Sequence, residues 1–396
     1  MAKLSPLSIY IHVPFCEKKN NFSGFLSIDD AAPQQVDAYV NALVNEIKSY
    51  ASKIGKNYRV GTIFLGGGDP AFLTPKQISK IMGCVYQNFK LAKNPEITIE
   101  AAPSSITIPK LKCWKSLGIN RLSIMFLSYD EIILRTLGAS HRTHQGIFAT
   151  KLAKKYGFDN INLDIIFDVP ISKDMADRGI RRDIRVELGA VLREVPFVTH
   201  ISTYAVVPEE GTLMMRKLDY EELYELDDEA SIDEEFGIVE ALEDFGFSRY
   251  EVTSWSRTGF KSKHNQAYWT GIREYLGLGL GAAGLMNGER YENTEDLNMY
   301  LLNPQKVAFR HPRTRKDIIN EILMLGLRTK QGVKLGTLSE LGYNIIRERA
   351  GEIMELRDMN LVKTTKTTLK ATTEGMLILN MLIDRLQIKD REQEQG

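Results

Sequence analysis

The hydrophobic and polar positions of the chain divide it into two kinds of segment. Six short runs are apolar and rich in β-branched residues along their whole length, as expected of strands covered on both faces. These predicted strands are residues 8–13, 61–66, 96–101, 121–126, 161–167 and 200–207. Segments with the spacing of amphipathic helices separate them, namely 34–55, 75–90, 109–117, 129–138, 144–156 and 175–194. This alternation predicts an α/β fold with a parallel sheet beneath helices.

Two of the predicted helices begin with sequences typical of capping boxes. Thr74 and Gln77 enclose a proline at the first helical position, and Ser128 and Glu131 have the same spacing. Six strand–helix units are fewer than a closed eight-fold barrel requires, so we expect an open or partial barrel. Ligands of such folds bind at the carboxyl ends of the strands.

The pattern changes in the second half of the chain. An acidic stretch keeps enough apolar positions to predict solvent-exposed helices, and a glycine-rich stretch follows it. From about Lys316 the sequence predicts several helices, a two-stranded hairpin and a last helix, the layout of a small winged-helix module. We therefore expect four regions: a partial barrel (1–215), an extension (216–310), a winged-helix-like module (311–388) and a disordered tail (389–396).

Composition and charge are those of an ordinary globular protein. The chain has 396 residues, of which 43% are hydrophobic and 26% charged, and its formal net charge is zero. This balance gives no indication of a nucleic-acid partner or of an acidic membrane surface. We expect a cytoplasmic protein without stable membrane insertion, because no long apolar run and no signal-peptide core are present. The three cysteines, Cys16, Cys84 and Cys113, are too few for a disulfide framework.

Chemically reactive residues occur where the predicted strands end. Cys16 follows the first strand and a run of three glycines, 66–68, follows the second. Glu100 and Asp164 are carboxylates in the otherwise apolar third and fifth strands. Each feature alone usually has a structural role, but together at one edge of a parallel sheet they predict a binding site.

Several short motifs occur in a fixed order along the chain. They are YIHVPFC, TIFLGGGDP, EITIEAAP, GINRLSI, LGASH, GFDNINLDIIFDVP and HNQAYW. Together they resemble the radical S-adenosylmethionine enzymes of the oxygen-independent coproporphyrinogen III oxidase group, and most closely its branch of HemW-type heme chaperones. The resemblance extends from about residue 7 to residue 387. It implies a partial (β/α)6 barrel with a C-terminal α+β extension, and [4Fe–4S] and S-adenosylmethionine as the cofactors of the family.

The family motif CxxxCxxC is incomplete in this chain. Cys16 stands at the first position, but Asn20 and Ser23 replace the second and third cysteines. In the family three thiolates bind three irons of the cluster, and neither an amide nor a hydroxyl group replaces a thiolate. Cys84 and Cys113 lie in helices predicted to pack outside the barrel, where they cannot complete the set. The sequence therefore predicts that cluster binding and radical chemistry have been lost.

Other positions of the family's S-adenosylmethionine site are partly kept. Asp69, Leu127 and Ala139 stand where the family has threonine, glutamine and arginine. Six residues match family positions that contact the ligand, namely Tyr10, Phe22, Gly67, Gly68, Glu100 and Asp164. We interpret this combination as a catalytically silent scaffold, and the alternative is chance divergence in a working enzyme.

The segment HNQAYW is a second candidate site. The resemblance to the HemW-type branch associates such a segment with heme, which makes His264 a candidate iron ligand. Tyr268 and Trp269 could then stack on a porphyrin face. Without the resemblance, a turn at His264 with both aromatic residues in the core is the simpler interpretation. Leu280 and Ala283 stand where the family usually has proline and histidine, so one polar group beside the porphyrin is missing.

The sequence supports three hypotheses about function. The first is a chaperone-like protein that binds heme or another tetrapyrrole, with a heme-accepting protein as a further partner. The alternative is an active radical S-adenosylmethionine oxidoreductase, related to oxygen-independent coproporphyrinogen III oxidase, that acts on a tetrapyrrole. An interaction protein that uses the winged-helix-like module has little support, because the net charge is zero and the basic patch at 310–316 is short.

Overall fold

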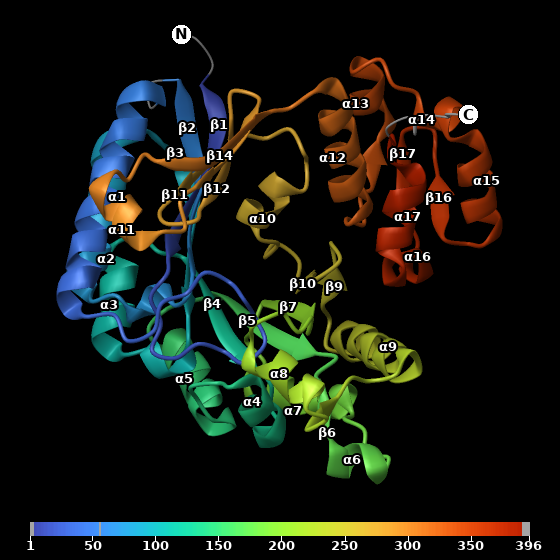
Figure 1. Cartoon of the computed structure of the whole chain (residues 1–396), viewed down its shortest axis with the longest axis horizontal. Helices are drawn as coiled ribbons and strands as arrows, with labels where there is room; N and C mark the ends of the chain where they lie inside the picture. The colour runs from blue at the N-terminus through green and yellow to red at the C-terminus, as the bar shows by residue number, and fades with distance from the viewer. Residues whose placement is uncertain (1–3, 55–56, 390–396) are drawn as a thin grey trace.

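A curved sheet of mostly parallel strands is the centre of the structure (Figure 1). The computed structural model describes residues 4–54 and 57–389. The six predicted strands are present as β1 (Ser5–Val13), β2 (Tyr58–Gly67), β3 (Leu91–Ala101), β4 (Arg121–Leu127), β5 (Asn160–Phe167) and β7 (His200–Ala205). They lie in chain order and every neighbouring pair is parallel. The predicted α/β fold with a partial barrel is confirmed.

Helices cover the outer face of this sheet (Figure 1). They are α1 (Pro33–Ile54), α2 (Pro75–Asn88), α3 (Ile108–Ser116), α4 (Glu131–Leu137) and α5 (Thr143–Lys155). The capping box of α2 is confirmed, because the Thr74 hydroxyl accepts from the Gln77 N–H and the Gln77 side chain accepts from the Thr74 N–H. The predicted capping box at Ser128 is wrong. Asp130 caps α4, and the Ser128 hydroxyl donates to buried Glu187 at 2.7 Å instead.

The predicted helix 175–194 is two helices, α6 (Lys173–Asp177) and α7 (Ile184–Glu194). Gly179 has a φ of 61° between them, and Asp183 caps the second helix through the N–H groups of Arg185 and Val186. The acidic stretch is also less helical than predicted. It contains β8 (Leu223–Tyr224), which pairs with β6 (Ile171–Ser172), and α9 (Asp228–Asp244), while α8 (Leu213–Asp219) precedes it.

The sheet extends beyond the six predicted strands at both edges. Next to β1 lies β11 (Tyr275–Leu278), followed by β12 (Ala283–Met286), β13 (Glu289–Asn293) and β14 (Val307–Pro312); at the other edge lie β10 (Ser254–Ser256) and β9 (Ser248–Arg249). The short helices of this region are α10 (Lys263–Tyr268) and α11 (Leu297–Leu302). Glycine is required at Gly277, since a Cβ atom there would lie 1.9 Å from the Ala283 carbonyl oxygen.

A buried carboxylate joins the first helix to this added part of the sheet. Glu46 of α1 accepts hydrogen bonds from the Gly279 N–H at 2.8 Å and from the Tyr300 hydroxyl at 2.6 Å. Its other oxygen accepts from the Asn293 amide at 2.8 Å. Burial raises the pKa of Glu46 to about 7. These bonds fix the glycine-rich loop against the end of β1, the strand that leads to the Cys16 loop.

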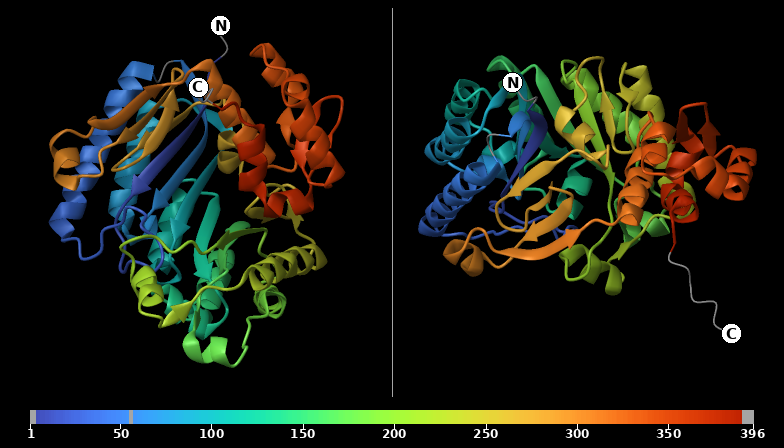
Figure 2. Two further views of the ribbon diagram at one scale, coloured as in Figure 1. Left: turned by 45° about the vertical axis from the view of Figure 1, so that its right-hand side comes forward. Right: turned by 90° about the horizontal axis from the view of Figure 1, so that it is seen from above.

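The C-terminal region packs around a hydrophobic cluster of its own, between Ile319 and Leu386 (Figure 2). Its helices are α12 (Arg315–Leu327), α13 (Leu335–Glu340), α14 (Ile345–Glu348), α15 (Ala350–Asp358), α16 (Thr373–Leu377) and α17 (Leu379–Leu386). A small antiparallel sheet contains β15 (Val333–Lys334), β17 (Thr368–Ala371) and β16 (Val362–Thr364). Residues 390–396 of the predicted tail lie outside the described residues. No helix within residues 4–54 and 57–389 has the length and apolar character needed to cross a membrane.

Candidate functional site

The loop after β1 is held by the two residues that replace cysteines. The Asn20 side-chain oxygen accepts hydrogen bonds from the Phe22 N–H at 3.1 Å and the Ser23 N–H at 2.7 Å. The Ser23 hydroxyl accepts from the Phe25 N–H at 3.1 Å. Asparagine and serine commonly stabilise turns in this way. Asn20 and Ser23 therefore use their side chains to shape the loop.

The remaining cysteine is poorly suited to bind a metal alone. Cys16 is buried, and its N–H donates to the Ile28 carbonyl at 3.0 Å. Burial, followed by the charges of Asp29 and Asp69, raises the pKa of the Cys16 thiol. A metal ion displaces the proton of a thiol that it binds, so the main obstacle is that Cys16 supplies one thiolate where a cluster needs three. Within the described residues no three or more histidine, cysteine, aspartate or glutamate side chains are grouped so that they could hold a metal ion.

A cavity of about 590 Å³ opens at the carboxyl ends of the parallel strands. It brings together the predicted residues Tyr10, Cys16, Phe22, Gly67, Gly68, Glu100 and Asp164. The replaced positions line the same cavity, namely Asn20, Ser23, Asp69, Leu127 and Ala139. Residues separated by up to about 150 positions in the sequence therefore form one site, as the parallel topology requires.

The two glycines at the end of β2 allow a close approach to the end of β1. Gly67 has a φ of 126°, and a Cβ atom there would lie 2.8 Å from the Val13 carbonyl oxygen. A Cβ atom on Gly68 would lie 2.6 Å from the Pro14 carbonyl oxygen. Only glycine fits at either position without moving the backbone.

The floor of the cavity is acidic and buried. Burial, and then the charge of Asp164, raises the pKa of Glu100 to about 8. Burial also raises the pKa of Asp164 to about 6. Glu100 accepts from the Gly67 N–H at 3.1 Å, and Asp164 accepts from the Asn162 amide at 2.8 Å. Near pH 7 Glu100 thus holds a proton for much of the time, and the floor offers both a donor and an acceptor.

His12 belongs to this site, although its place in an apolar strand is typical of a core residue. Its Nδ1 accepts from the Tyr10 hydroxyl at 3.0 Å when its Nε2 donates to the Leu26 carbonyl at 3.1 Å. Burial lowers the pKa of His12 to about 4, so the ring is neutral at physiological pH. The pattern of the strand alone does not distinguish a core histidine from one that lines a cavity.

Asp69 has a structural role at the edge of the cavity. Its side chain accepts hydrogen bonds from the Ala71 N–H at 3.1 Å, the Ala102 N–H at 3.2 Å and the Ser105 hydroxyl. It thereby caps the 3₁₀ turn η1 (Pro70–Phe72) and connects it to η2 (Pro103–Ser105). Burial raises the pKa of Asp69 to about 6. Asp69 thus supports the backbone on which the site is built.

The three residues of the heme hypothesis do not share one open site. His264 is 1% exposed, and its ring nitrogens lie 2.8 Å from the Thr62 hydroxyl and 2.7 Å from the Tyr268 hydroxyl. The Tyr268 ring packs edge-on against His264, and burial lowers the pKa of His264 to about 3. Both ring nitrogens are therefore engaged, and axial ligation of an iron would require one of these hydrogen bonds to break.

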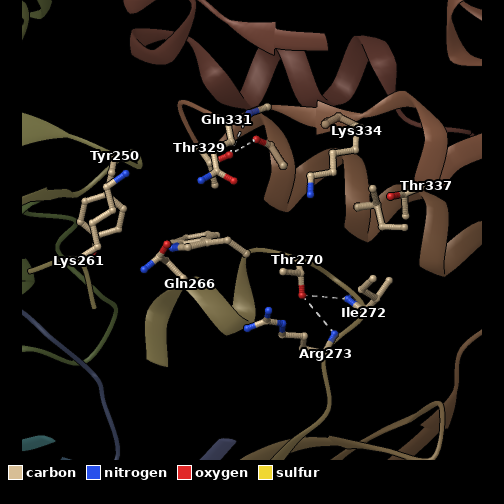
Figure 3. Close-up of a pocket in the computed structure, with 15 residues that line it drawn as sticks. Tyr250, Lys261, Gln266, Thr270, Ile272, Arg273, Thr329, Gln331, Lys334 and Thr337 are labelled. Atoms are coloured by element: carbon tan, nitrogen blue, oxygen red, sulfur yellow. Dashed lines mark hydrogen bonds between the residues drawn. The ribbon is translucent and has the colours of Figure 1, made fainter. Parts of the chain in front are cut away.

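Trp269 instead lines a separate cavity of about 280 Å³ between α10 and the C-terminal region (Figure 3). Lys261, Arg273 and Lys334 also line it, and no carboxylate among the described residues does. Figure 3 shows that Arg273 and Lys334 come from opposite sides of this cavity. The indole N–H of Trp269 has no hydrogen-bond partner in the described part of the chain. Of the predicted trio, His264 is enclosed, whereas Tyr268 and Trp269 are half-buried and line two different cavities.

Comparison with known proteins adds a family relationship to this geometry. Residues 10–182 match the model of the radical SAM superfamily, and residues 314–378 match that of the HemN C-terminal domain. A heme chaperone HemW of Mycobacterium tuberculosis is 30% identical over 360 residues, which cover 88% of this chain and 87% of the relative. The heme chaperone HemW of Bacillus subtilis is 28% identical over 379 residues, which cover 94% of this chain and 97% of the relative.

A solved structure shares the whole fold. The coproporphyrinogen III oxidase HemN of Escherichia coli, described as a radical SAM enzyme, superposes with a TM-score of 0.80 at 20% identity. The match covers 97% of this chain and 90% of the other. The same architecture thus extends from β1 to the last helices.

Proposed function

The chain belongs to the HemW family of heme chaperones within the radical S-adenosylmethionine superfamily, and on this basis we propose that it binds heme or a related porphyrin as a chaperone. We further propose that it does so without a [4Fe–4S] cluster and without radical chemistry. A heme-accepting protein is then its natural partner. The cytoplasm remains the proposed place of action, on the grounds of sequence composition.

One observation carries the second part of this proposal. A cavity lies at the strand ends, but the thiolates that a cluster needs are missing: a single buried Cys16 stands beside Asn20 and Ser23, whose side chains bond to the loop backbone. A cluster with one thiolate in place of three would leave its irons open to water and to loss. The residues present therefore do not fit a [4Fe–4S] cluster.

The rest of the cavity supports a binding role rather than a radical reaction. We propose that Tyr10, Gly67, Gly68, Glu100 and Asp164 still form a polar floor that can hold a small ligand. Leu127 and Phe22 belong to an apolar cluster at its rim, where the family has a polar group at the position of Leu127. Such a floor can orient a ligand, but it offers no group that would supply an electron to it.

Heme titration of the purified protein tests the proposed function. We expect saturable binding of heme by the wild-type chain, followed through its absorption spectrum. We expect His264→Ala to leave the spectrum of the bound heme unchanged, since both ring nitrogens of His264 already have protein partners. The same variant should lower the free energy of unfolding by about 1–3 kcal/mol, because buried hydroxyl groups lose their partner.

Trp269→Phe is the matched control, because it keeps an aromatic face and changes no ligand to iron. Absence of saturable heme binding by the wild type would contradict the proposed function. A shifted heme spectrum in His264→Ala at unchanged stability would show that His264 is the iron ligand after all, and that its interior contacts open when heme binds.

A further inference from the structure

A cavity of about 520 Å³ lies between one edge of the sheet and the C-terminal helices. Phe167 and Trp255, from β5 and β10, line it on the side of the sheet, whereas Met376, Leu379 and Met381, from α16 and α17, line it on the other side. These elements are labelled in Figure 1. The cavity thus has apolar walls that come from both the barrel and the C-terminal region.

A buried arginine with unused donors lies at this cavity. Arg249 is 6% exposed, and its Nη2 donates to Glu235 at 2.8 Å and to the Val252 carbonyl at 2.5 Å. Its Nε and Nη1 have no hydrogen-bond partner within the described residues. The guanidinium lies 5.4 Å from the centre of the Trp255 ring. Both of these nitrogens are themselves enclosed by the protein, so Arg249 contributes its positive charge and its contact with Trp255 to the wall of the cavity.

A second arginine at the cavity makes its hydrogen bonds to neutral oxygens. Arg328, directly after α12, donates to the Met324 carbonyl at 2.9 Å and to the Asn380 side-chain oxygen at 3.5 Å. Burial lowers the pKa of Arg328, which is the direction expected for a cation without a nearby counterion. The Val252 N–H donates to the Arg328 carbonyl at 2.8 Å, so the residue that Arg249 contacts also positions Arg328.

The charged side chains that line the cavity therefore have a net charge of +1. Its charged residues are Arg249, Arg328 and Glu235, and Glu235 is already paired with Arg249. No histidine or cysteine lines the cavity within the described residues. A ligand that fits has a large apolar body and at least one carboxylate, which an arginine can bind through two parallel hydrogen bonds.

We infer, on the basis of the proposed function, that this cavity holds the tetrapyrrole, with a carboxylate on Arg328 near the positive charge of Arg249 and its ring between the two apolar walls. The volume of 520 Å³ lies within the range of about 300–1,000 Å³ usual for ligand pockets. The cavity beside Trp269, at about 280 Å³, is smaller. The described lining offers neither imidazole nor thiolate, although Met376 and Met381 supply thioethers that can bind iron. Recognition through the carboxylates predicts that metal-free porphyrin binds as well.

Substitutions at the two ends of the hydrogen bond between Arg328 and Asn380 test this inference. Arg328→Gln removes the cation, and Asn380→Asp places a carboxylate beside it that competes with the ligand. Asn380 is exposed, so this second variant should fold even if the first is impaired. We expect each to raise the Kd of protoporphyrin about tenfold or more, the usual size of losing a partly desolvated charged contact.

Two controls test whether the porphyrin binds in this cavity or elsewhere on the protein. Arg273→Gln changes a cation of the Trp269 cavity and should alter the Kd less than about twofold. Protoporphyrin with both propionates esterified should bind the wild type as weakly as free protoporphyrin binds Arg328→Gln. The Kd of this ester should be the same for the wild type and for the variants. Unchanged affinity of both variants at Arg328 and Asn380, or a loss confined to Arg273→Gln, would overturn the inference while leaving heme binding intact. Absence of porphyrin binding by the wild type would reject the proposed function itself.

Discussion

The double variant Asn20→Cys, Ser23→Cys should hold close to four irons per chain after anaerobic reconstitution with iron and sulfide, because about four irons make up a cluster of this kind. Cys16 already supplies the first thiol, and its backbone is fixed by hydrogen bonds between the two sides of the loop at Pro14 and Ile28. The backbone at the first of the three thiolate positions is therefore fixed before the cluster binds. Iron and sulfide analysis after desalting measures the gain.

The matched control adds Cys16→Ser to the double variant, which should abolish the gain by removing one of the three thiolates. The double variant without iron should also be less stable by about 1 kcal/mol, because the Phe22 and Ser23 N–H groups lose the Asn20 acceptor. Equal iron content with and without Cys16 would show that the iron is bound nonspecifically and that the loop no longer forms the family's site.

Cleavage of S-adenosylmethionine should remain slow in the double variant and rise by about tenfold or more when Leu127→Gln and Ala139→Arg are added. Both residues line the cavity, and the family resemblance implies polar groups at their positions. Leu127 has a φ of 66°, a conformation that glutamine adopts at no greater cost than leucine. Formation of 5′-deoxyadenosine under reducing conditions measures the reaction.

Asp69 is kept in all of these variants, because its buried carboxylate caps η1 and binds Ser105. Leu127→Met with Ala139→Leu is a suitable control, since it changes the size of the side chains without adding polar groups. Rapid cleavage by the cysteine variant alone, equal to that of the fuller variant, would mean that Leu127 and Ala139 do not limit the reaction.

The sequence predicts the barrel well for a physical reason. Strands buried on both faces are continuous apolar runs, and their carboxyl ends meet at one edge, so the residues that follow them fall into one cavity. Cys16, Glu100 and Asp164 could thus be placed together from the strand pattern, and the structure brings them into one cavity; Tyr10, which the family resemblance indicates, lies in the same cavity. The pattern does not predict β11 and β12 because they have four residues each and lie in a glycine-rich stretch that is typical of loops. It does not predict β13 and β14 because neither is a continuous apolar run.

The remaining differences concern side-chain directions, which spacing does not fix. The motif HNQAYW places the three candidate heme-binding residues within six positions. In the structure, however, His264 points inward to Thr62, and Trp269 lines another cavity. At Asp69 the sequence indicates only a departure from the family pattern, and the structure adds that its side chain caps η1. Arg249 and Arg328 are far apart in the sequence, and only the tertiary fold connects both to Val252.

Iron counting on the wild-type protein, purified and reconstituted under anaerobic conditions, tests the central claim most directly. With a single neutral thiol at Cys16 and hydrogen-bonded Asn20 and Ser23 beside it, we expect fewer than about one iron per chain after desalting and no 5′-deoxyadenosine from added S-adenosylmethionine. Close to four irons per chain, together with reductive cleavage of S-adenosylmethionine, would contradict the claim that the scaffold has lost its radical chemistry.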